Sequence, residues 1–197
     1  MKKLVIITLV SLQAFIMIAC IDKEPPNTPK PKGYFRIETP KATYQKWDSV
    51  LPFTFEYSRF AQFSIPKKEQ NIYWMDLFYP QYNASLKMTL IPVKNNLREL
   101  IVNEEKMLMF HVENRKADDI IYSNVNDEKS RVYGQLYEIM GKGAATPLKF
   151  WLTDSTHYYV RATLYFNFTP NNDSLEPVIK YLKNDLLHLI DTWNWKK

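Results

Sequence analysis

Cysteine, glycine and histidine are all scarce in this chain of 197 residues, which has one, four and three of them. A single cysteine, Cys20, excludes an intramolecular disulfide in any redox compartment. Without further cysteines or a His-x-x-x-His spacing, the ligand pattern of a zinc site is missing. The acidic pairs at 118–119 and 127–128 are typical of solvated loops rather than of cation sites. We therefore expect neither a metal nor an organic cofactor.

Clustered positive charge is also missing. The formal net charge is +5, but residues 1–33 contribute +3 of it, which leaves only +2 for residues 34–197. No Lys/Arg block occurs in that larger part. Because a nucleic-acid interface needs a clustered basic face, we expect no nucleic-acid partner.

The long apolar run at residues 4–18 is shorter than the roughly 20 residues that a membrane-spanning helix needs. It follows the positive residues Lys2 and Lys3, and it ends at Ala19, a small residue just before Cys20. This layout is typical of a secretory signal. We predict a signal peptide at 1–19, cleavage between Ala19 and Cys20, and lipidation of the Cys20 thiol. The alternatives are an uncleaved anchor and a cysteine of no importance.

Residues 20–33 then form the predicted tether. Four prolines and several charges in residues 21–33 cannot build a core, and such a segment behaves as a semi-rigid, extended spacer. Because one acyl chain binds a membrane only weakly, stable anchoring takes additional chains such as palmitate. We expect the domain to be held near the inner or the outer membrane, most simply in the periplasm. Asp22 does not decide between the two membranes.

Residues 34–197 are predicted to form one globular domain. Aromatic residues recur in alternating patterns, which are typical of half-buried strands. The predicted strands are 53–57, 60–65, 71–79, 85–93, 119–123, 130–140, 147–152 and 157–168.

Helical spacing of apolar residues appears twice in this domain. The first helix starts at Asn96, is capped by Asn95 or Asn96, and is expected to bury Leu97, Leu100, Ile101, Met107, Leu108 and His111. Its polar residues Arg98, Glu99, Glu104 and Glu105 are expected to face away from the core. The second helix is capped within residues 170–174 and carries an apolar stripe from Leu175 to Trp193, with Pro177 in its first turn.

These elements predict an α+β domain with a mainly antiparallel sheet of about six to seven strands and two amphipathic helices packed on it. The order of the elements resembles the Mog1/PsbP-like layered sandwich.

The candidates for catalysis are few. His111 and His188 lie at the edges of helical stripes, where packing is the simpler role. His157 follows Asp154 and Ser155, but neighbours on one hairpin rarely form a catalytic triad, and no G-x-S-x-G elbow occurs. The loop 141–147, GKGAATP, lacks the phosphate-loop pattern and is expected to join two strands. We predict a protein that is not an enzyme.

Exposed aromatic side chains would be the anchors of an interaction surface. Of the four candidates, Trp74, Trp151 and Trp193 are expected in the core, and Trp195 is expected to be exposed because it lies near the C-terminus.

Several segments carry a family resemblance. Residues 31–37 (PKGYFRI), 51–57 (LPFTFEY), 143–147 (GAATP), 153–156 (TDST), 164–167 (LYFN) and 170–178 (PNNDSLEPV) resemble, in the same order, GldD-type gliding-motility lipoproteins. Lys142 makes the loop before 143–147 more basic than in that family. The resemblance implies a cell-envelope lipoprotein that is required for gliding and linked to type IX secretion. It brings no known catalytic residue to any position.

Three functions follow from this sequence. The first is a non-enzymatic accessory or scaffold protein with partners in the envelope machinery. The second is a tethered binding module for a lipid, a glycan or a small molecule, which an enclosed apolar cavity would indicate. The third is an envelope hydrolase that uses His157 and a nucleophile.

Overall fold

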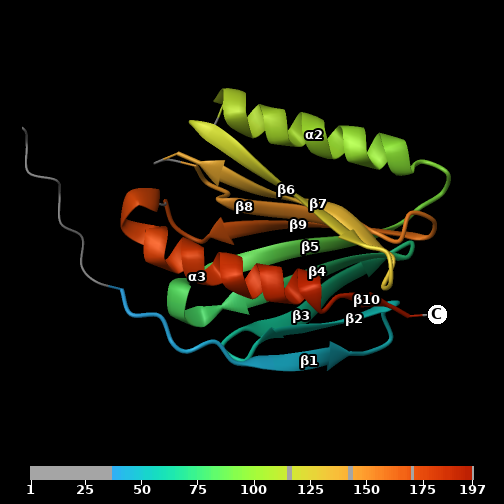
Figure 1. The fold of residues 1–197 in the computed structure, drawn as a ribbon, viewed down its shortest axis with the longest axis horizontal. Coiled ribbons are helices and arrows are strands. Elements are labelled where there is room, and N and C mark those ends of the chain that lie inside the picture. Colours follow the sequence, from blue (N-terminus) through green and yellow to red (C-terminus); the bar gives the residue numbers. More distant parts are fainter. Residues whose placement is uncertain (1–36, 115–116, 142–143, 170, 197) are drawn as a thin grey trace, which may run out of the picture. The chain divides into compact units, whose positions relative to one another are not determined.

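Seven of the strands form one large antiparallel sheet in the structure, a computed structural model that describes residues 37–114, 117–141, 144–169 and 171–196. The predicted signal peptide, Cys20 and the tether lie outside these residues. The sheet has the order β3-β4-β5-β9-β8-β7-β6 (Figure 1). Its strands are β3 (Gln62–Glu69), β4 (Ile72–Tyr79), β5 (Ala84–Pro92), β6 (Asp119–Asp127), β7 (Val132–Met140), β8 (Leu148–Thr153) and β9 (Tyr158–Phe166). The expectation of a mainly antiparallel sheet is confirmed.

A second, three-stranded sheet was not predicted. It has the order β1-β2-β10, with β1 (Tyr44–Asp48), β2 (Phe53–Ser58) and β10 (Asn194–Trp195). The continuous aromatic pattern of residues 53–65 is divided between the two sheets by a turn, in which the Ala61 N–H donates to the Ser58 carbonyl at 3.0 Å. The two-residue β10 is too short for any periodicity to show in the sequence.

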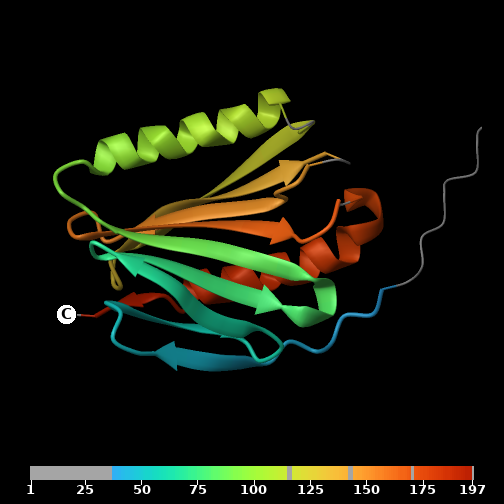
Figure 2. The ribbon, with the colours of Figure 1, turned by 180° about the vertical axis from the view of Figure 1, so that it is seen from behind.

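Two long helices cover opposite faces of the large sheet (Figures 1 and 2). They are α2 (Leu97–Asn114) and α3 (Asn172–Asp191), and a short 3-10 turn, η1 (Pro80–Tyr82), joins β4 to β5. Side chains alternate across the sheet, so Leu136 of β7 joins the core under α3 while Tyr137 joins a smaller cluster with Leu108 of α2. The small sheet packs on the α3 side. The α+β prediction with two helices is therefore confirmed.

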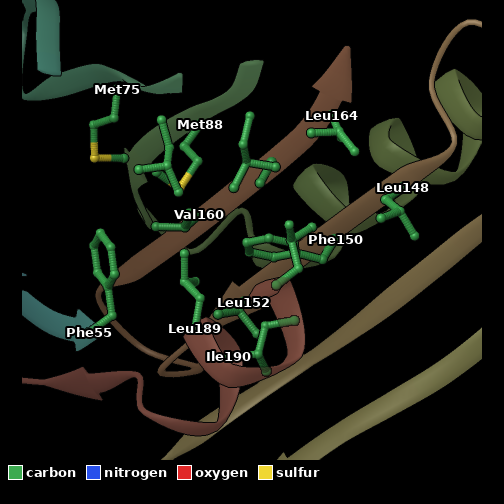
Figure 3. Close-up of a cluster of buried hydrophobic side chains, with 14 of the residues drawn as sticks. Phe55, Met75, Met88, Leu148, Phe150, Leu152, Val160, Leu164, Leu189 and Ile190 are labelled. Atoms are coloured by element: carbon green, nitrogen blue, oxygen red, sulfur yellow. The ribbon is translucent and has the colours of Figure 1, made fainter. Parts of the chain in front are cut away.

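The main core lies between the large sheet, α3 and the small sheet (Figure 3). Phe55 of β2, Met75 of β4, Phe150 of β8 and Leu189 of α3 are each at most 1% exposed. Each such side chain stabilises the fold by about 1.5–3 kcal/mol through burial. Packing of these large side chains fixes the positions of α3 and the small sheet on the large sheet.

The ends of the helices differ in detail from the prediction. α3 begins at Asn172, so Pro177 lies in its second turn rather than its first, where the missing N–H removes one helical hydrogen bond. The side chain of its N-cap residue, Asn171, makes no capping hydrogen bond. Asn96 does precede α2, but its Oδ1 accepts from the Lys94 N–H at 2.8 Å. Burial of the apolar stripe of α3 outweighs these local defects.

Candidate functional site

Asp154 and His157 lie together on the β8–β9 hairpin, in the geometry of a turn. The Asp154 carboxylate accepts the N–H groups of Thr156, His157 and Tyr158 at 3.0, 2.7 and 2.8 Å. His157 Nδ1 lies 3.2 Å from the same carboxylate and 2.8 Å from Thr156 Oγ1. Burial pushes the pKa of the Asp154 carboxyl up, but the backbone hydrogen bonds outweigh it and lower the pKa. His157 has an acidic partner, as a hydrolase would need. That carboxylate, however, is already engaged by three backbone N–H groups of the hairpin.

Replacement of Asp154 by Ala is expected to cost about 2 kcal/mol of unfolding free energy, because three N–H groups lose a charged acceptor. His157→Ala is expected to cost less than about 0.5 kcal/mol, since its side chain is 72% exposed. Because the pKa is lowered from 3.8, the contribution of Asp154 to stability is complete above about pH 5 and is lost progressively as the pH falls through the folded-state pKa. Urea unfolding at pH 7 measures both variants. Equal losses for both would contradict the structural role of Asp154.

His188 packs between α3 and the small sheet. Its ring stacks on Tyr44 with centroids 3.6 Å apart, and its Nε2 lies 2.8 Å from a carboxylate oxygen of Glu56. This confirms the packing role expected for His188. The side chain of His111 lies outside the described residues.

A buried carboxylate lies one turn before His188. Asp185 is 2% exposed and accepts a hydrogen bond from the Tyr44 hydroxyl at 3.2 Å. Burial raises the pKa of the Asp185 carboxyl, and burial together with that carboxyl raises the pKa of Tyr44 to about 12. This carboxylate was not singled out in the sequence, because it interrupts an otherwise apolar helical face.

Asp185→Asn is expected to raise the thermal midpoint at pH 7.5. The raised pKa means that the folded state holds the proton more tightly than the unfolded state, so ionisation of Asp185 costs stability as the pH rises above 3.8. The asparagine keeps an acceptor for Tyr44 and carries no charge. The gain should therefore shrink as the pH is lowered toward 4, which thermal unfolding over this pH range measures. A gain that does not change with pH would contradict this account.

An ion pair is buried between α2 and the large sheet. Glu104 of α2 was expected to face solvent, but it is 1% exposed and its Oε1 lies 2.7 Å from Lys149 Nζ of β8. Arg161 of β9 places Nη1 4.0 Å from the other carboxylate oxygen. The prediction for Glu104 was wrong because its partners belong to distant strands that the helix pattern does not show.

The outer side of α2 and the neighbouring strand β6 expose apolar side chains. Met107, predicted to be buried, is 44% exposed because Glu104 and Leu108 take the positions that face the sheet. The group, called here the α2–β6 surface, consists of Val102, Met107, Met109 and Phe110 of α2 and Tyr122 of β6, each at least 37% exposed. A gathering of exposed apolar residues marks an interaction site more often than scattered ones do. This surface is the candidate interface.

The burial of the tryptophans agrees with the prediction only in part. Trp195 was predicted to be exposed, but it is only 9% exposed because β10 pairs with β2 and turns this side chain onto the core. Trp193 is buried as predicted, while Trp74 and Trp151 are half-buried. Trp74 lies under the ammonium group of Lys67, 4.7 Å from the ring centroid.

The hollows of the described residues bear on the ligand-binding alternative. One of about 700 Å³, lined among others by Glu38, Gln81, Tyr82 and Phe168, is open to solvent and mixes polar with apolar groups. Core side chains fill most of the space between the large sheet and α3, and the hollows of about 500 and 240 Å³ at its margins are open to solvent. None of these hollows has the enclosed apolar form that a lipid-binding module needs.

The loop after β7 connects strands, as predicted. Asn172 at the start of α3 donates its Nδ2 hydrogens to the carbonyls of Gly141 and Ala144 at 2.7 and 3.0 Å. These contacts join the loop to the helix. Lys142 and Gly143 lie outside the described residues.

Neither a metal-ligating cluster nor a membrane-spanning helix occurs in the described part of the chain. It contains no group of three or more His, Cys, Asp or Glu side chains placed to hold a metal ion. None of its helices is long and apolar enough to cross a membrane.

Comparison with known proteins gives the family. No curated protein matches the chain. The family model described as gliding motility lipoprotein GldD matches residues 24–195, which include the candidate interface, the buried Glu104–Lys149 pair and the buried Asp185. The match confirms the resemblance found in the sequence, and the chain belongs to the GldD family of gliding motility lipoproteins.

Proposed function

We propose that this protein is a non-enzymatic accessory or scaffold component of the gliding and type IX secretion machinery, anchored to a membrane through Cys20. The observation that carries the proposal is the family match over residues 24–195. A lipoprotein family implies membrane association and a location in the cell envelope. The proposal includes export by the signal peptide 1–19, acyl chains on Cys20 such as palmitate, and a domain in the periplasm.

Two features of the domain support a scaffold role. The α2–β6 surface offers exposed apolar residues to a partner. The Asp154–His157 pair, the strongest candidate for catalysis in the sequence, is engaged in a hairpin turn. Tethering raises the local concentration of the domain beside its partners, so a modest interface suffices.

The test is deletion of the gene, scored by colony spreading and by secretion of type IX substrates. We expect the deletion to abolish spreading and the wild-type gene to restore it. Cys20→Ala is expected to restore little, because an unlipidated protein is not held at the membrane. Normal spreading of the deletion strain would overturn the motility role, and full rescue by Cys20→Ala would show that the anchor is dispensable.

A further inference from the structure

The strand β6 is an open edge of the large sheet. It pairs with β7 over nine consecutive residue pairs, from Asp119 opposite Met140 to Asp127 opposite Val132, without a shift of register. No strand within the described ranges pairs with its other side. Every second residue of such a strand turns its backbone N–H and C=O outward, where a further strand can pair with them.

The opposite edge of the same sheet is protected. In β3, Pro66 removes a backbone donor, and the register shifts between Ser64 and Lys67. Lys67 and Lys68 add charge to this edge. Proline, lysine and bulges are the features by which edge strands avoid pairing with other chains. The sequence of β6, DIIYSNVND, contains neither proline nor lysine.

Side-chain hydrogen bonds hold β6 in place. Trp151 Nε1 donates to the Tyr137 hydroxyl at 2.9 Å, and this hydroxyl donates to Gln135 Oε1 at 2.8 Å. The Gln135 amide in turn donates to Asn124 Oδ1 of β6 at 3.1 Å. A strand ordered in advance loses less conformational entropy when a further strand pairs with it.

Both faces beside this edge offer contacts to the side chains of an added strand. Tyr122, on the α2 face, is 54% exposed, and Ile121, on the α3 face, is 45% exposed. Next to Ile121 on the α3 face lies a hollow of about 240 Å³, lined by Ser123 and Val125 of β6 and by Leu187 of α3 among others. Side chains of an added strand point alternately to the two faces of the sheet. Those on the α2 face would cover Tyr122, and those on the α3 face would cover Ile121 and fill the hollow.

The charge at the two ends of β6 is negative. Asp118 and Asp119 lie at its start and Asp127 and Glu128 at its end, and Lys129 in the following turn offsets one of the two charges at that end. A second copy of this chain, paired antiparallel about Ser123, would set Asp119 directly against Asp127 of the partner copy. Like charges in that position are destabilising. A partner with basic residues at both ends of its strand fits instead.

We propose that β6 is a strand-addition site for an extended segment of a partner protein, with alternating apolar residues and Lys or Arg at both ends. Main-chain hydrogen bonds to the open edge provide the affinity, and the acidic ends of β6 select the partner. The proposal deepens the scaffold role and rests on it for the identity of the partner as an envelope protein.

The test uses the full-length lipoprotein in detergent and two fluorescein-labelled peptides, KTVTVTVTK and ETVTVTVTE. We expect saturable binding of the Lys-ended peptide by fluorescence anisotropy, and binding of the Glu-ended peptide that is about tenfold weaker or more. In the variant Asp118→Lys/Glu128→Lys each end of β6 keeps one acidic residue beside one lysine, so the preference for the Lys-ended peptide should disappear. The matched control Glu38→Lys/Glu69→Lys changes the net charge equally, away from β6, and should bind as wild type does. Absence of saturable binding to wild type, or an unchanged preference in Asp118→Lys/Glu128→Lys, would overturn the proposal.

Tyr122→Pro and Ser123→Pro test the main-chain pairing. Adjacent residues of β6 direct their N–H groups alternately to β7 and outward. In one of the two variants proline therefore replaces a residue whose N–H points outward, and this variant should keep the wild-type thermal midpoint because no hydrogen bond to β7 is lost. That variant is expected to lose peptide binding at least tenfold. A concentration-dependent dimer that this variant abolishes would assign the edge to a second copy and overturn the proposal.

The two proposals can fail separately. Normal spreading of the deletion strain would remove the motility role, whatever the peptides do. A spreading defect of the deletion strain, together with wild-type spreading of the Asp118→Lys/Glu128→Lys strain and no peptide binding, would remove only the edge site.

Discussion

Lys149→Met and Glu104→Gln are each expected to lower the free energy of unfolding by about 3–5 kcal/mol. Each substitution keeps the approximate shape of its side chain but leaves the other charge buried without its partner, 2.7 Å away in the native protein. For a domain of this size, the loss corresponds to a fall of roughly 6–20 °C in the thermal midpoint. Of the two, Lys149→Met should be the milder, because Arg161 lies 4.0 Å from the Glu104 carboxylate and partly compensates its charge.

The double variant Glu104→Leu/Lys149→Met distinguishes a lost ion pair from a damaged core. Replacement of both partners by apolar side chains removes both desolvation penalties, so most of the lost stability should return. Glu105→Ala, an exposed neighbour on the same helix, is the matched control and should change the stability by less than about 0.5 kcal/mol. Urea unfolding of these variants, together with the single variant Glu104→Leu that closes the cycle, gives the coupling energy. Additive losses in the double variant would show that the pair itself contributes nothing.

The sequence predicts the parts of this fold that depend on periodicity. Alternation in segments such as 71–79 and 85–93 corresponds to β4 and β5, and the stripe from Leu175 corresponds to the buried face of α3. The face of α2 was predicted less well. Its apolar residues suggested a buried stripe, but Glu104 takes a buried position and Met107 an exposed one. The strand order explains why Glu104 rather than Met107 is buried, because it places Lys149 of β8 beneath α2 as the partner of Glu104.

The open edge at β6 could not be located from the sequence for a similar reason. Residues 119–127 show no special motif, and their openness depends on β6 being the last strand of the order β3-β4-β5-β9-β8-β7-β6. Trp195 is the opposite case, a residue that long-range pairing buries rather than exposes. Nothing near it in the chain predicts that it packs on the core, since its position depends on pairing with Phe53 of the distant strand β2. Long-range pairing, which local patterns do not report, decides both.

Substitution of Gly134, in the middle of β7, is the second change for which we expect a large loss of stability. The sign of this stability change distinguishes a close approach of β7 and β8 from the usual effect of glycine in a strand. In a strand, Gly→Ala usually stabilises a protein by roughly 0.5–1 kcal/mol, because glycine loses more conformational freedom on folding. At Gly134, however, an added Cβ would lie 2.0 Å from the backbone carbonyl oxygen of Trp151 and 2.9 Å from a methyl carbon of Leu152. The first of these neighbours is backbone and cannot rotate away, so β7 and β8 would have to move apart.

We therefore expect Gly134→Ala to cost about 3 kcal/mol, the upper part of the range for overpacked interiors, and to lower the thermal midpoint by roughly 6–12 °C. Asn126→Ala is the control, because it is an exposed position of the neighbouring strand and should stay within about 0.5 kcal/mol of wild type. A neutral or stabilising effect of Gly134→Ala would mean that β7 and β8 approach less closely than this structure shows. Since β7 is the strand on which β6 is built, loss of binding at the β6 edge should accompany the loss of stability.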